Sequence, residues 1–315
     1  MDLLCDVLVR EVVSYANTSD TLSYRLTNQM LRQAAMHHTP NPSYIMGRIR
    51  YLVAAFPYLK SLVLNQKRYY SEDDFCHLHS IQILVLREHY FSVKPHYFKH
   101  LHHLLSLDLR HNASAGYNDS IFPYLTNLTE FFISDNYVIS DEGLSQLTKL
   151  KRLTLHSVRR ISNKGLSTMT QLTYLDLYHM SDITDVSYLP LEELHMTFGS
   201  LSPQGLSKTL TTLYVLGCKQ FSTLEGLETL PLHKVSINYC SFPDDDFRYL
   251  KQVKHLVLYG NTYITGSGLH YLKEVTSLMM YKMPLLDIYV NALSKNPHLK
   301  TLQIYDCNLK NPPAL

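Results

Sequence analysis

The 315-residue sequence lacks a long apolar run, and that absence excludes a membrane-spanning helix. No stretch reaches the roughly 18–20 apolar residues that such a helix needs. A strong net charge is missing too, because the formal charge is only +2 with neutral histidines. So small an excess gives no basis for binding nucleic acid or an anionic membrane. We therefore expect neither as a partner.

Cysteine is also rare. The five cysteines are an odd number, which does not suit a disulfide framework. The first ten residues, "MDLLCDVLVR", lack the basic leader and apolar core of a secretory signal. Both features favour reduced thiols. The sequence therefore predicts a cytoplasmic or nuclear protein.

Motifs for catalysis and for nucleotide binding are absent as well. Glycine is scarce, at 11 residues, and there is no phosphate-binding loop, dinucleotide Gly motif, H-E-x-x-H or G-x-S-x-G. Two weaker features remain. The histidines His96, His100 and His103 share one helical face and have the spacing of zinc ligands, or they lie on a solvated turn. The "PDDD" at 243–246 is an ion site or a capped turn. We predict no catalytic residue, no metal and no cofactor, and hence no enzyme.

What the sequence does contain is a repeat. The template L-x-x-L-x-L-x-x-N/C matches "LLSLDLRHN" from Leu104, "LTEFFISDN" from Leu128 and "LTTLYVLGC" from Leu210. Twelve copies, several of them weaker, start between Leu59 and Leu299, which is 240 residues over eleven intervals, or about 22 per copy. The alternation sends every second side chain inward, as a strand requires. One unit cannot bury its leucines alone, so the copies must stack.

Residues 59–307 thus resemble leucine-rich repeat proteins. The resemblance implies an α/β fold, a leucine-rich repeat solenoid with a curved parallel sheet and short convex helices or 3₁₀ turns. We expect the Asn that closes a copy (Asn112, Asn136, Asn261) to hydrogen-bond the backbone of adjacent repeats, and the Cys (Cys218, Cys240, Cys307) to do so weakly. Cys218 and Cys240 lie one repeat apart, so they are interpreted as neighbouring ladder positions or, alternatively, as metal ligands.

A second motif lies between the strands: "ISDEGL", "ISNKGL", "LSPQGL" and "ITGSGL". Its hydroxyl residues Ser140, Ser162, Ser202 and Thr265 stand where a helix N-cap is expected, and the closing leucine should point into the core. This motif resembles the repeats attached to F-box proteins, whereas residues 183–196 are more similar to the tight repeats of internalin-type proteins. The intervals 172–191 and 191–210 span only 19 residues, which predicts a tighter convex side there.

The outward positions of the strands form a ladder that is rich in tyrosine. Tyr and Arg are enriched at binding hot spots, so a curved sheet lined with them suits the docking of a protein. The alternative is that tyrosines are simply favourable in strands. The predicted substrate-binding residues on the concave face are Arg87, Arg110, His156, Asp176, Tyr178, His195, Tyr214, Tyr259, Tyr281 and Tyr305.

Residues 4–35 do not follow the repeat. A short helix, a break at "ANTSD" and a second helix from about Thr21 are predicted from the apolar spacing. The segment resembles an F-box, although Cys5 stands where that family has Pro and Leu31 where it has Trp. Under this interpretation the adaptor-binding residues are Leu3, Leu4, Val7, Val9 and Val13. The alternative is a plain helical cap on the first repeat.

These observations predict three parts: an F-box-like helical segment at 1–36, a linker or capping helix at 37–58, and a leucine-rich repeat domain at 59–315. The resemblance implies a substrate-recognition subunit of a Skp–cullin–F-box ubiquitin ligase. Its partners would be a Skp-type adaptor, the cullin ligase and a protein substrate. A stand-alone interaction scaffold is the second hypothesis, and a metal-dependent enzyme that uses the histidines at 96–103 is the third.

Overall fold

A computed structural model describes residues 53, 58–65, 72–87, 93–112, 117–293, 296–307 and 309. The predicted F-box-like segment at 1–36, with all five adaptor-binding residues, lies outside the described residues, as does most of 37–58. The chain forms two compact units. The first comprises residues 1–150 and 158–160, and the second comprises 151–157 and 161–315.

The first unit contains four parallel strands that pair in chain order. Short helices connect them, and each strand with the following helix and turn makes one repeat. The elements are β1 (Ser61–Asn65), η3 (Glu72–His77), β2 (Ile83–Arg87), η4 (Pro95–His100), β3 (Ser106–Leu109), η5 (Asp119–Tyr124), β4 (Glu130–Ser134) and α5 (Asp141–Leu144).

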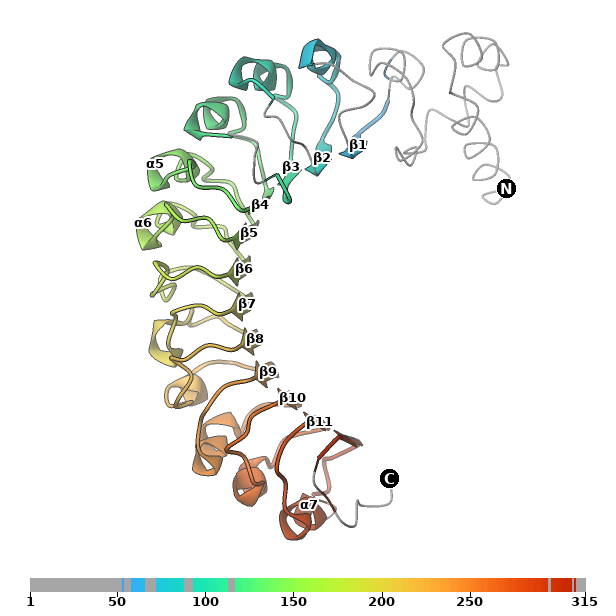
Figure 1. Cartoon of the computed structure of the whole chain (residues 1–315), viewed down its shortest axis with the longest axis vertical. Helices are drawn as coiled ribbons and strands as arrows, with labels where there is room; N and C mark the ends of the chain where they lie inside the picture. The colour runs from blue at the N-terminus through green and yellow to red at the C-terminus, as the bar shows by residue number, and fades with distance from the viewer. Residues whose placement is uncertain are drawn as a thin grey trace, which may run out of the picture. The chain divides into compact units, whose positions relative to one another are not determined.

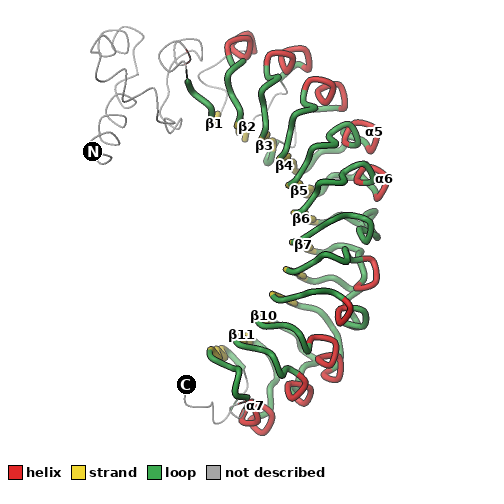
Figure 2. The backbone as a smooth tube through the Cα atoms, turned by 180° about the vertical axis from the view of Figure 1, so that it is seen from behind, coloured by secondary structure: helices red, strands yellow, loops and turns green. Residues whose placement is uncertain are grey.

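The second unit continues the pattern with eight parallel strands in chain order. Within this unit the strands line the inner side of an arc and the helices its outer side (Figures 1 and 2). The elements are β5 (Arg152–His156), α6 (Asn163–Leu166), β6 (Tyr174–Tyr178), β7 (Glu193–Thr197), η6 (Pro203–Gly205), β8 (Thr212–Leu216), η7 (Leu227–Thr229), β9 (Lys234–Asn238), η8 (Asp244–Leu250), β10 (His255–Tyr259), η9 (Ser267–Tyr271), β11 (Ser277–Tyr281), α7 (Asp287–Leu293) and β12 (Thr301–Tyr305).

The twelve strands of the described residues confirm the twelve predicted copies. Each strand from β1 to β11 buries its second and fourth residues, as Leu175 and Leu177 of β6 show with exposures of 0% and 1%, whereas Ile304 of β12 is half-buried. Burying a leucine fully contributes about 1.5–3 kcal/mol, so the stacked leucines form the core of each unit. The tighter convex side is also confirmed. Residues 179–192 contain no helix, and η6 spans three residues.

The hydroxyl residues of the convex motif are helix caps in three of the four copies. Ser140, Ser162 and Ser202 are N-cap residues, and Ser162 accepts a hydrogen bond from the Lys164 amide at 3.2 Å. The prediction is wrong for Thr265, because Gly266 with φ 101° takes the cap position. The closing leucines are buried as expected, namely Leu144, Leu166, Leu206 and Leu269.

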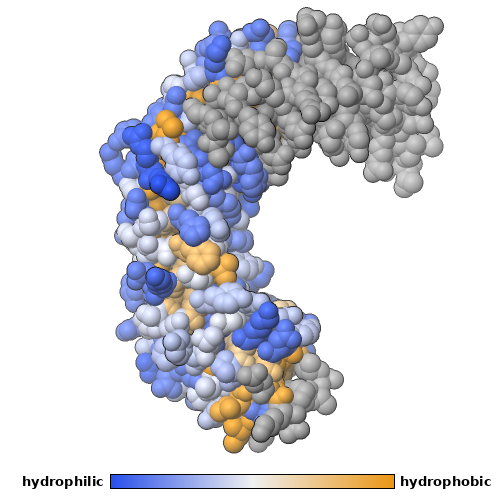
Figure 3. Space-filling model, in the orientation of Figure 1, coloured by the Kyte–Doolittle hydropathy of each residue, from blue (hydrophilic) through white to orange (hydrophobic). Residues whose placement is uncertain are grey.

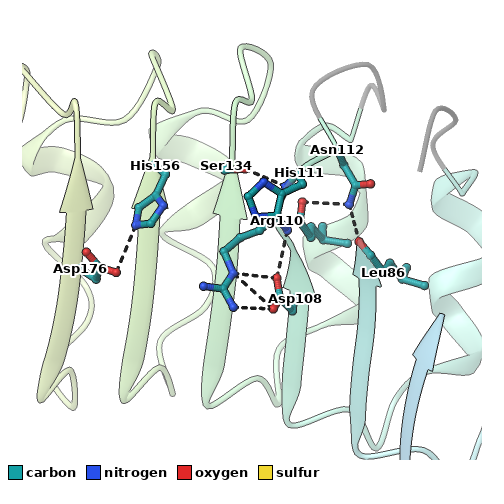
Figure 4. A network of polar contacts seen from close by, with 9 residues as sticks. Leu86, Asp108, Arg110, His111, Asn112, Ser134, His156 and Asp176 are labelled. Carbon is teal, nitrogen blue, oxygen red and sulfur yellow. Dashed lines mark hydrogen bonds and ion pairs between the residues drawn. The ribbon is translucent and has the colours of Figure 1, made fainter. Parts of the chain in front are cut away.

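The asparagines that close a copy connect neighbouring repeats, as predicted. Asn261 donates to the Ile237 carbonyl at 2.7 Å and accepts from the Cys240 amide at 2.8 Å. Asn112 donates to the Leu86 carbonyl (Figure 4). The cysteines do so weakly, since the Cys218 thiol lies 3.8 Å from the Met196 carbonyl oxygen. Buried amides must be paired, so these contacts fix the point at which the chain leaves each strand.

Within the residues that the structure describes, no helix combines the length and the apolar character that crossing a membrane requires.

Candidate interaction surface on the sheet

The first, third and fifth residues of each strand project from the core and form what we call the sheet face. Strand register aligns them repeat by repeat, for example Tyr259 with Tyr281 and Tyr281 with Tyr305. Parallel pairing places such partners one strand spacing apart, about 4.8 Å. The predicted ladder is therefore in register within each unit.

Among the described residues of the first unit, Asp108 and Arg110 form a charge pair on the sheet face. The Arg110 guanidinium donates to both Asp108 carboxylate oxygens at 2.8–3.3 Å (Figure 4). It also lies 5.2 Å from the Phe132 ring centroid. The Asp108 carboxylate also accepts from the Arg110 amide at 3.0 Å and is buried. The charge of Arg110 is thus neutralised by its own strand. The side chain of Arg87, another predicted site residue, lies outside the described part.

In strands β5 to β7, the acidic groups of the sheet face lie beside histidines. Nε2 of His156 lies 3.1 Å from Asp176 across neighbouring strands (Figure 4), and Nε2 of His195 lies 2.6 Å from Glu193 within one strand. The His195 ring also packs on Tyr214 at 4.2 Å between centroids. These predicted residues are therefore brought together in contacting groups rather than scattered.

Basic side chains cover tyrosine rings at the edges of this group. The Arg152 guanidinium lies 3.8 Å from the Tyr174 ring centroid, a cation–π distance. The Lys234 ammonium lies 5.1 Å from the Tyr214 ring centroid. A hydrogen bond with the Tyr214 hydroxyl raises the pKa of Lys234. The contacts hold these long side chains over the sheet.

Strands β10 to β12 present a continuous row of tyrosines. The Tyr259 and Tyr281 rings stack at 5.3 Å between centroids, and the Tyr281 and Tyr305 rings lie 5.2 Å apart. Tyr305 is 45% exposed, and the other two are half-buried. Neighbouring rings restrict one another's rotamers, so the row offers a large aromatic area at low entropic cost on binding.

Two further side chains join this row at its edge. The Tyr259 hydroxyl accepts hydrogen bonds from Tyr239 and Lys282, and both bonds lower the pKa of Tyr259. The pKa of Lys282 is raised by the same contact, and its ammonium lies 5.7 Å from the Tyr259 ring centroid. Neither Tyr239 nor Lys282 belongs to a strand. Both directly follow one.

Tyr239 and Lys282 belong to a series that we call the left-handed row. It consists of the residue at the sixth position from each strand start, where φ is 50–65° from β3 onward. Eight of its ten described members are not glycine, although such residues rarely adopt positive φ. The members are His111, Asp135, Ser157, His179, Phe198, Gly217, Tyr239, Gly260, Lys282 and Asp306.

The left-handed row presents exposed aromatic side chains. Phe198 is 48% exposed and Tyr239 is 53% exposed. Each ring lies over the glycine of the next repeat: a Cβ at Gly217 would stand 2.4 Å from Cε1 of Phe198, and one at Gly260 would stand 2.5 Å from Cε1 of Tyr239. His179 stacks on Phe198 at 4.9 Å. The missing side chain at each glycine therefore leaves the space that the aromatic ring of the preceding repeat occupies.

This row was not among the residues that the sequence predicted as a site. The signal available was small: Gly217 and Gly260 recur at one phase, directly after the last strand residue. Since glycine tolerates positive φ, that phase marks a left-handed position in every repeat. The same phase indicates that the bulky residues at this position in other repeats lie at the edge of the sheet face.

The other sequence candidates are not brought together as a metal site among the described residues. The histidines at 96, 100 and 103 lie in and after η4, and nowhere in the described ranges do three or more His, Cys, Asp or Glu residues form a group that could hold a metal. The "PDDD" segment begins η8, where the Asp244 carboxylate accepts from Thr265 and Gly266 at 2.7–3.0 Å and Asp246 accepts from the Leu224 amide at 2.8 Å. These carboxylates connect repeats.

One exposed apolar patch lies away from the sheet face. Ile288 is 71% exposed and Leu286 is 50% exposed, at and just before the start of α7. Apolar atoms gather at this end of the second unit in the space-filling view (Figure 3). The repeat pattern gave no indication of this patch, because it lies in the variable convex segment.

Comparisons with solved structures identify the architecture. A leucine-rich repeat protein of Leptospira interrogans matches at 20% identity with a TM-score of 0.63, over 93% of this chain and 88% of that one. An internalin (InlF) of Listeria monocytogenes matches at 18% identity with a TM-score of 0.52, over 82% of this chain and 71% of that one. The fold is a leucine-rich repeat solenoid.

A third similar structure is the complex of TLR13 with a single-stranded RNA, at 18% identity and a TM-score of 0.61. The match covers 84% of this chain but only 42% of that one. No family model matches the chain, and no curated protein is similar enough to count as a match. These likenesses support the fold that the repeat predicted.

Proposed function

We propose that this chain is a protein-binding scaffold that captures its partner on the sheet face of β5 to β12. The observation that carries the proposal is the stacked row of Tyr259, Tyr281 and Tyr305, which combines aromatic area with phenolic hydroxyls. Tyrosine is a typical hot-spot residue because one end is apolar and the other forms hydrogen bonds. The protein itself does no chemistry in this role.

Strand propensity alone explains the tyrosine row less well than a binding role does. Tyrosine suits any outward strand position, yet these three side chains share the fifth position of consecutive strands. The aromatic area continues into Tyr239, which is outside the strands and has a left-handed backbone. A left-handed tyrosine is not favoured by strand propensity, so its presence beside the row supports a binding role.

The test is a triple substitution, Tyr259→Ala, Tyr281→Ala and Tyr305→Ala, in the full chain. Affinity for partners that co-purify with the wild type should fall by on the order of 100-fold or more, because hot-spot side chains contribute over about 1 kcal/mol each. The matched control is Tyr263→Ala, since Tyr263 is 67% exposed in a turn outside the strands. Unchanged partners for the triple variant would refute the proposal.

We further propose that the scaffold is the substrate-recognition subunit of a Skp–cullin–F-box ubiquitin ligase. Its support is the sequence of residues 4–35, which aligns with an F-box without gaps and precedes the repeats, with residues 37–58 between them. The apolar residues Leu3, Leu4, Val7, Val9 and Val13 would bind the Skp-type adaptor. The sheet face would then hold the substrate near the ligase.

This finer proposal is tested by co-expressing the full chain with a Skp-type adaptor. A complex should form at micromolar concentrations, and the double variant Val7→Asp, Val13→Asp should abolish it, because buried unpaired charges disrupt apolar packing. The control is Thr18→Asp, in the predicted break between the helices. Absence of the wild-type complex, together with intact partner capture by the tyrosine row, would favour the stand-alone scaffold.

A further inference from the structure

The sheet face of β8 to β12 has a one-sided charge. Its strand positions and left-handed residues include two lysines, Lys234 and Lys282, and one carboxylate, that of Asp306. Lys254 and Lys300, which directly precede β10 and β12, are also exposed. The only acidic side chain of this face lies at its far end, directly after β12.

The two lysines point at tyrosines and not at acids. Lys234 lies over the Tyr214 ring, and Lys282 lies over the Tyr259 ring. Among the described residues neither ammonium group forms an ion pair with a carboxylate. A lysine held by an aromatic ring keeps its full charge and has further N–H donors to offer.

The neighbouring strands of the same unit are arranged differently. On β5 to β7, Asp176 lies beside His156 and Glu193 beside His195, so the acidic groups there have basic neighbours within the sheet. Within β8 to β12, the charges of Glu193 and Asp306 act on Lys234 and Lys282 without forming an ion pair with them, so the lysines keep donors for a partner. This part of the face is suited to a partner that supplies the missing carboxylates.

The centre of the same area is apolar. Val257 and Met279 occupy the third position of β10 and β11, align with one another and are half-buried. The basic first-position residue Lys234 lies on one side of this strip, and the tyrosines of the fifth position lie on the other. A fitting partner thus brings apolar side chains for the strip as well as negative charge.

We propose that the sheet face of β8 to β12 binds an acidic polypeptide segment that carries apolar side chains between its carboxylates. This inference rests on the proposed scaffold function and specifies the chemistry of its partner. Carboxylates of the segment contact Lys234 and Lys282, and its apolar side chains cover Val257 and Met279. Tyrosine hydroxyls donate further hydrogen bonds to the carboxylates.

A nucleic acid fits this face less well, although it is also an anion. Binding nucleic acid needs many phosphate contacts, and this face has two lysines, with Lys254 and Lys300 beside it, in a chain of net charge +2. The tyrosine row can stack on bases, but the apolar strip of Val257 and Met279 beside it matches aliphatic side chains and not a sugar–phosphate backbone. The observations therefore favour a polypeptide.

The experiment uses the full chain and three probes: a copolymer of glutamate and tyrosine, a copolymer of lysine and tyrosine, and a single-stranded oligonucleotide. The acidic copolymer should bind best, and its affinity should fall with added salt. Lys234→Gln and Lys282→Gln should each weaken it by about fivefold, as expected for one partly exposed charge pair. Lys282→Arg should retain binding, because it keeps the charge.

The matched control is Lys219→Gln, since Lys219 is exposed in the turn after β8 and away from the sheet face. Equal binding of the two copolymers, tighter binding of the oligonucleotide, or an unaltered affinity in the Lys234→Gln, Lys282→Gln double variant would each overturn the inference. If the tyrosine triple variant still loses its partners in that case, the scaffold function stands and only the acidic class of partner is wrong.

Discussion

At the scale of single residues, the left-handed row shows how this repeat tolerates backbone strain. A non-glycine residue at positive φ costs roughly 1–2 kcal/mol. Here the amide of the strained residue donates to the fifth residue of the next strand, as His179 does to Thr197 at 2.9 Å and Tyr239 to Tyr259 at 2.8 Å. The bond adds a rung to the parallel ladder and offsets part of the strain. The side chain is then fixed at the edge of the sheet face.

The first prediction concerns Gly217, which lies beneath the Phe198 ring. Gly217→Ala should destabilise the protein by about 1–2 kcal/mol, because alanine at φ 62° is strained and its Cβ also displaces the Phe198 ring. Gly226→Ala serves as control, since Gly226 also has positive φ but its Cβ would meet nothing closer than 3.8 Å. Denaturant unfolding measures both variants.

A double-mutant cycle separates the two causes in Gly217→Ala. Adding Phe198→Ala removes the ring, so the double variant should lose less stability than the sum of the single losses, by about 0.5 kcal/mol or more. If the two losses in the free energy of unfolding simply added, the Phe198 ring would not depend on the space at Gly217.

The second prediction concerns thiol reactivity and its pH dependence. Burial raises the pKa of Cys240 to about 11, so the thiol stays protonated at neutral pH and only the thiolate is reactive. In the folded protein at pH 8, iodoacetamide should alkylate the exposed Cys76 and spare Cys240, which should react as the pH approaches 11. Mass spectrometry of peptides measures both, with denatured protein as the control. Equal alkylation of the two cysteines at pH 8 would contradict this prediction.

Much of the residue-scale description was predictable from the sequence. The ladder of Tyr259, Tyr281 and Tyr305 followed from counting positions after each leucine, because the strand period is two. The left-handed row did not follow, since His179, Phe198 and Tyr239 carry no local signal for positive φ. That conformation is imposed by the next repeat, which the pattern of one repeat does not contain.

At the scale of elements, carboxylates on the convex side connect one repeat to the next. Asp119 of η5 accepts from the Ser140 amide at 2.9 Å and from its hydroxyl at 2.5 Å. It occupies the space where Gly143 has no side chain, because a Cβ there would stand 2.2 Å from its Oδ1. Asp244 contacts Thr265 and Gly266 in the same way. The glycine of the convex motif therefore leaves room for an aspartate of the preceding repeat.

The third prediction tests such a connection with two adjacent aspartates. Asp244→Ala should destabilise the protein by about 1–3 kcal/mol, because it leaves two amides and a hydroxyl of the next repeat without their acceptor. Asp245→Ala is the matched control, since Asp245 is exposed in the same turn of η8. Its cost should stay within about 0.5 kcal/mol. Equal losses for the two variants would refute the role of Asp244.

Strands were more predictable than the convex helices for a physical reason. A strand position is marked by leucines that must be buried, and twelve strands were found where the template placed them. The convex caps depend on contacts between repeats. Thr265 illustrates this, because its hydroxyl donates to Asp244 at 2.7 Å and leaves the cap to Gly266.

At the scale of the whole molecule, a solenoid derives its stability from contacts between neighbouring repeats. A repeat with neighbours on both sides buries its leucine face completely, as Leu256 and Leu278 do with exposures of 1% and 0%. Leu302 of β12 is 9% exposed, and Ile304 is only half-buried. The last described repeat is therefore held by fewer contacts than those before it.

A fourth prediction follows from that gradient. Backbone amides of 301–305 should exchange with solvent faster than those of 277–281, because local opening costs least where burial is least. Hydrogen exchange with residue-level mass spectrometry measures the difference, and residues 255–259 are the reference for a central strand. Equal protection of the three strands would contradict it.

The same gradient ranks the tyrosines as hot spots. Tyr281 stacks on both Tyr259 and Tyr305, so Tyr281→Ala should weaken partner binding more than Tyr305→Ala. Tyr305 lies on the less buried last strand, and its side chain must first be ordered on the partner.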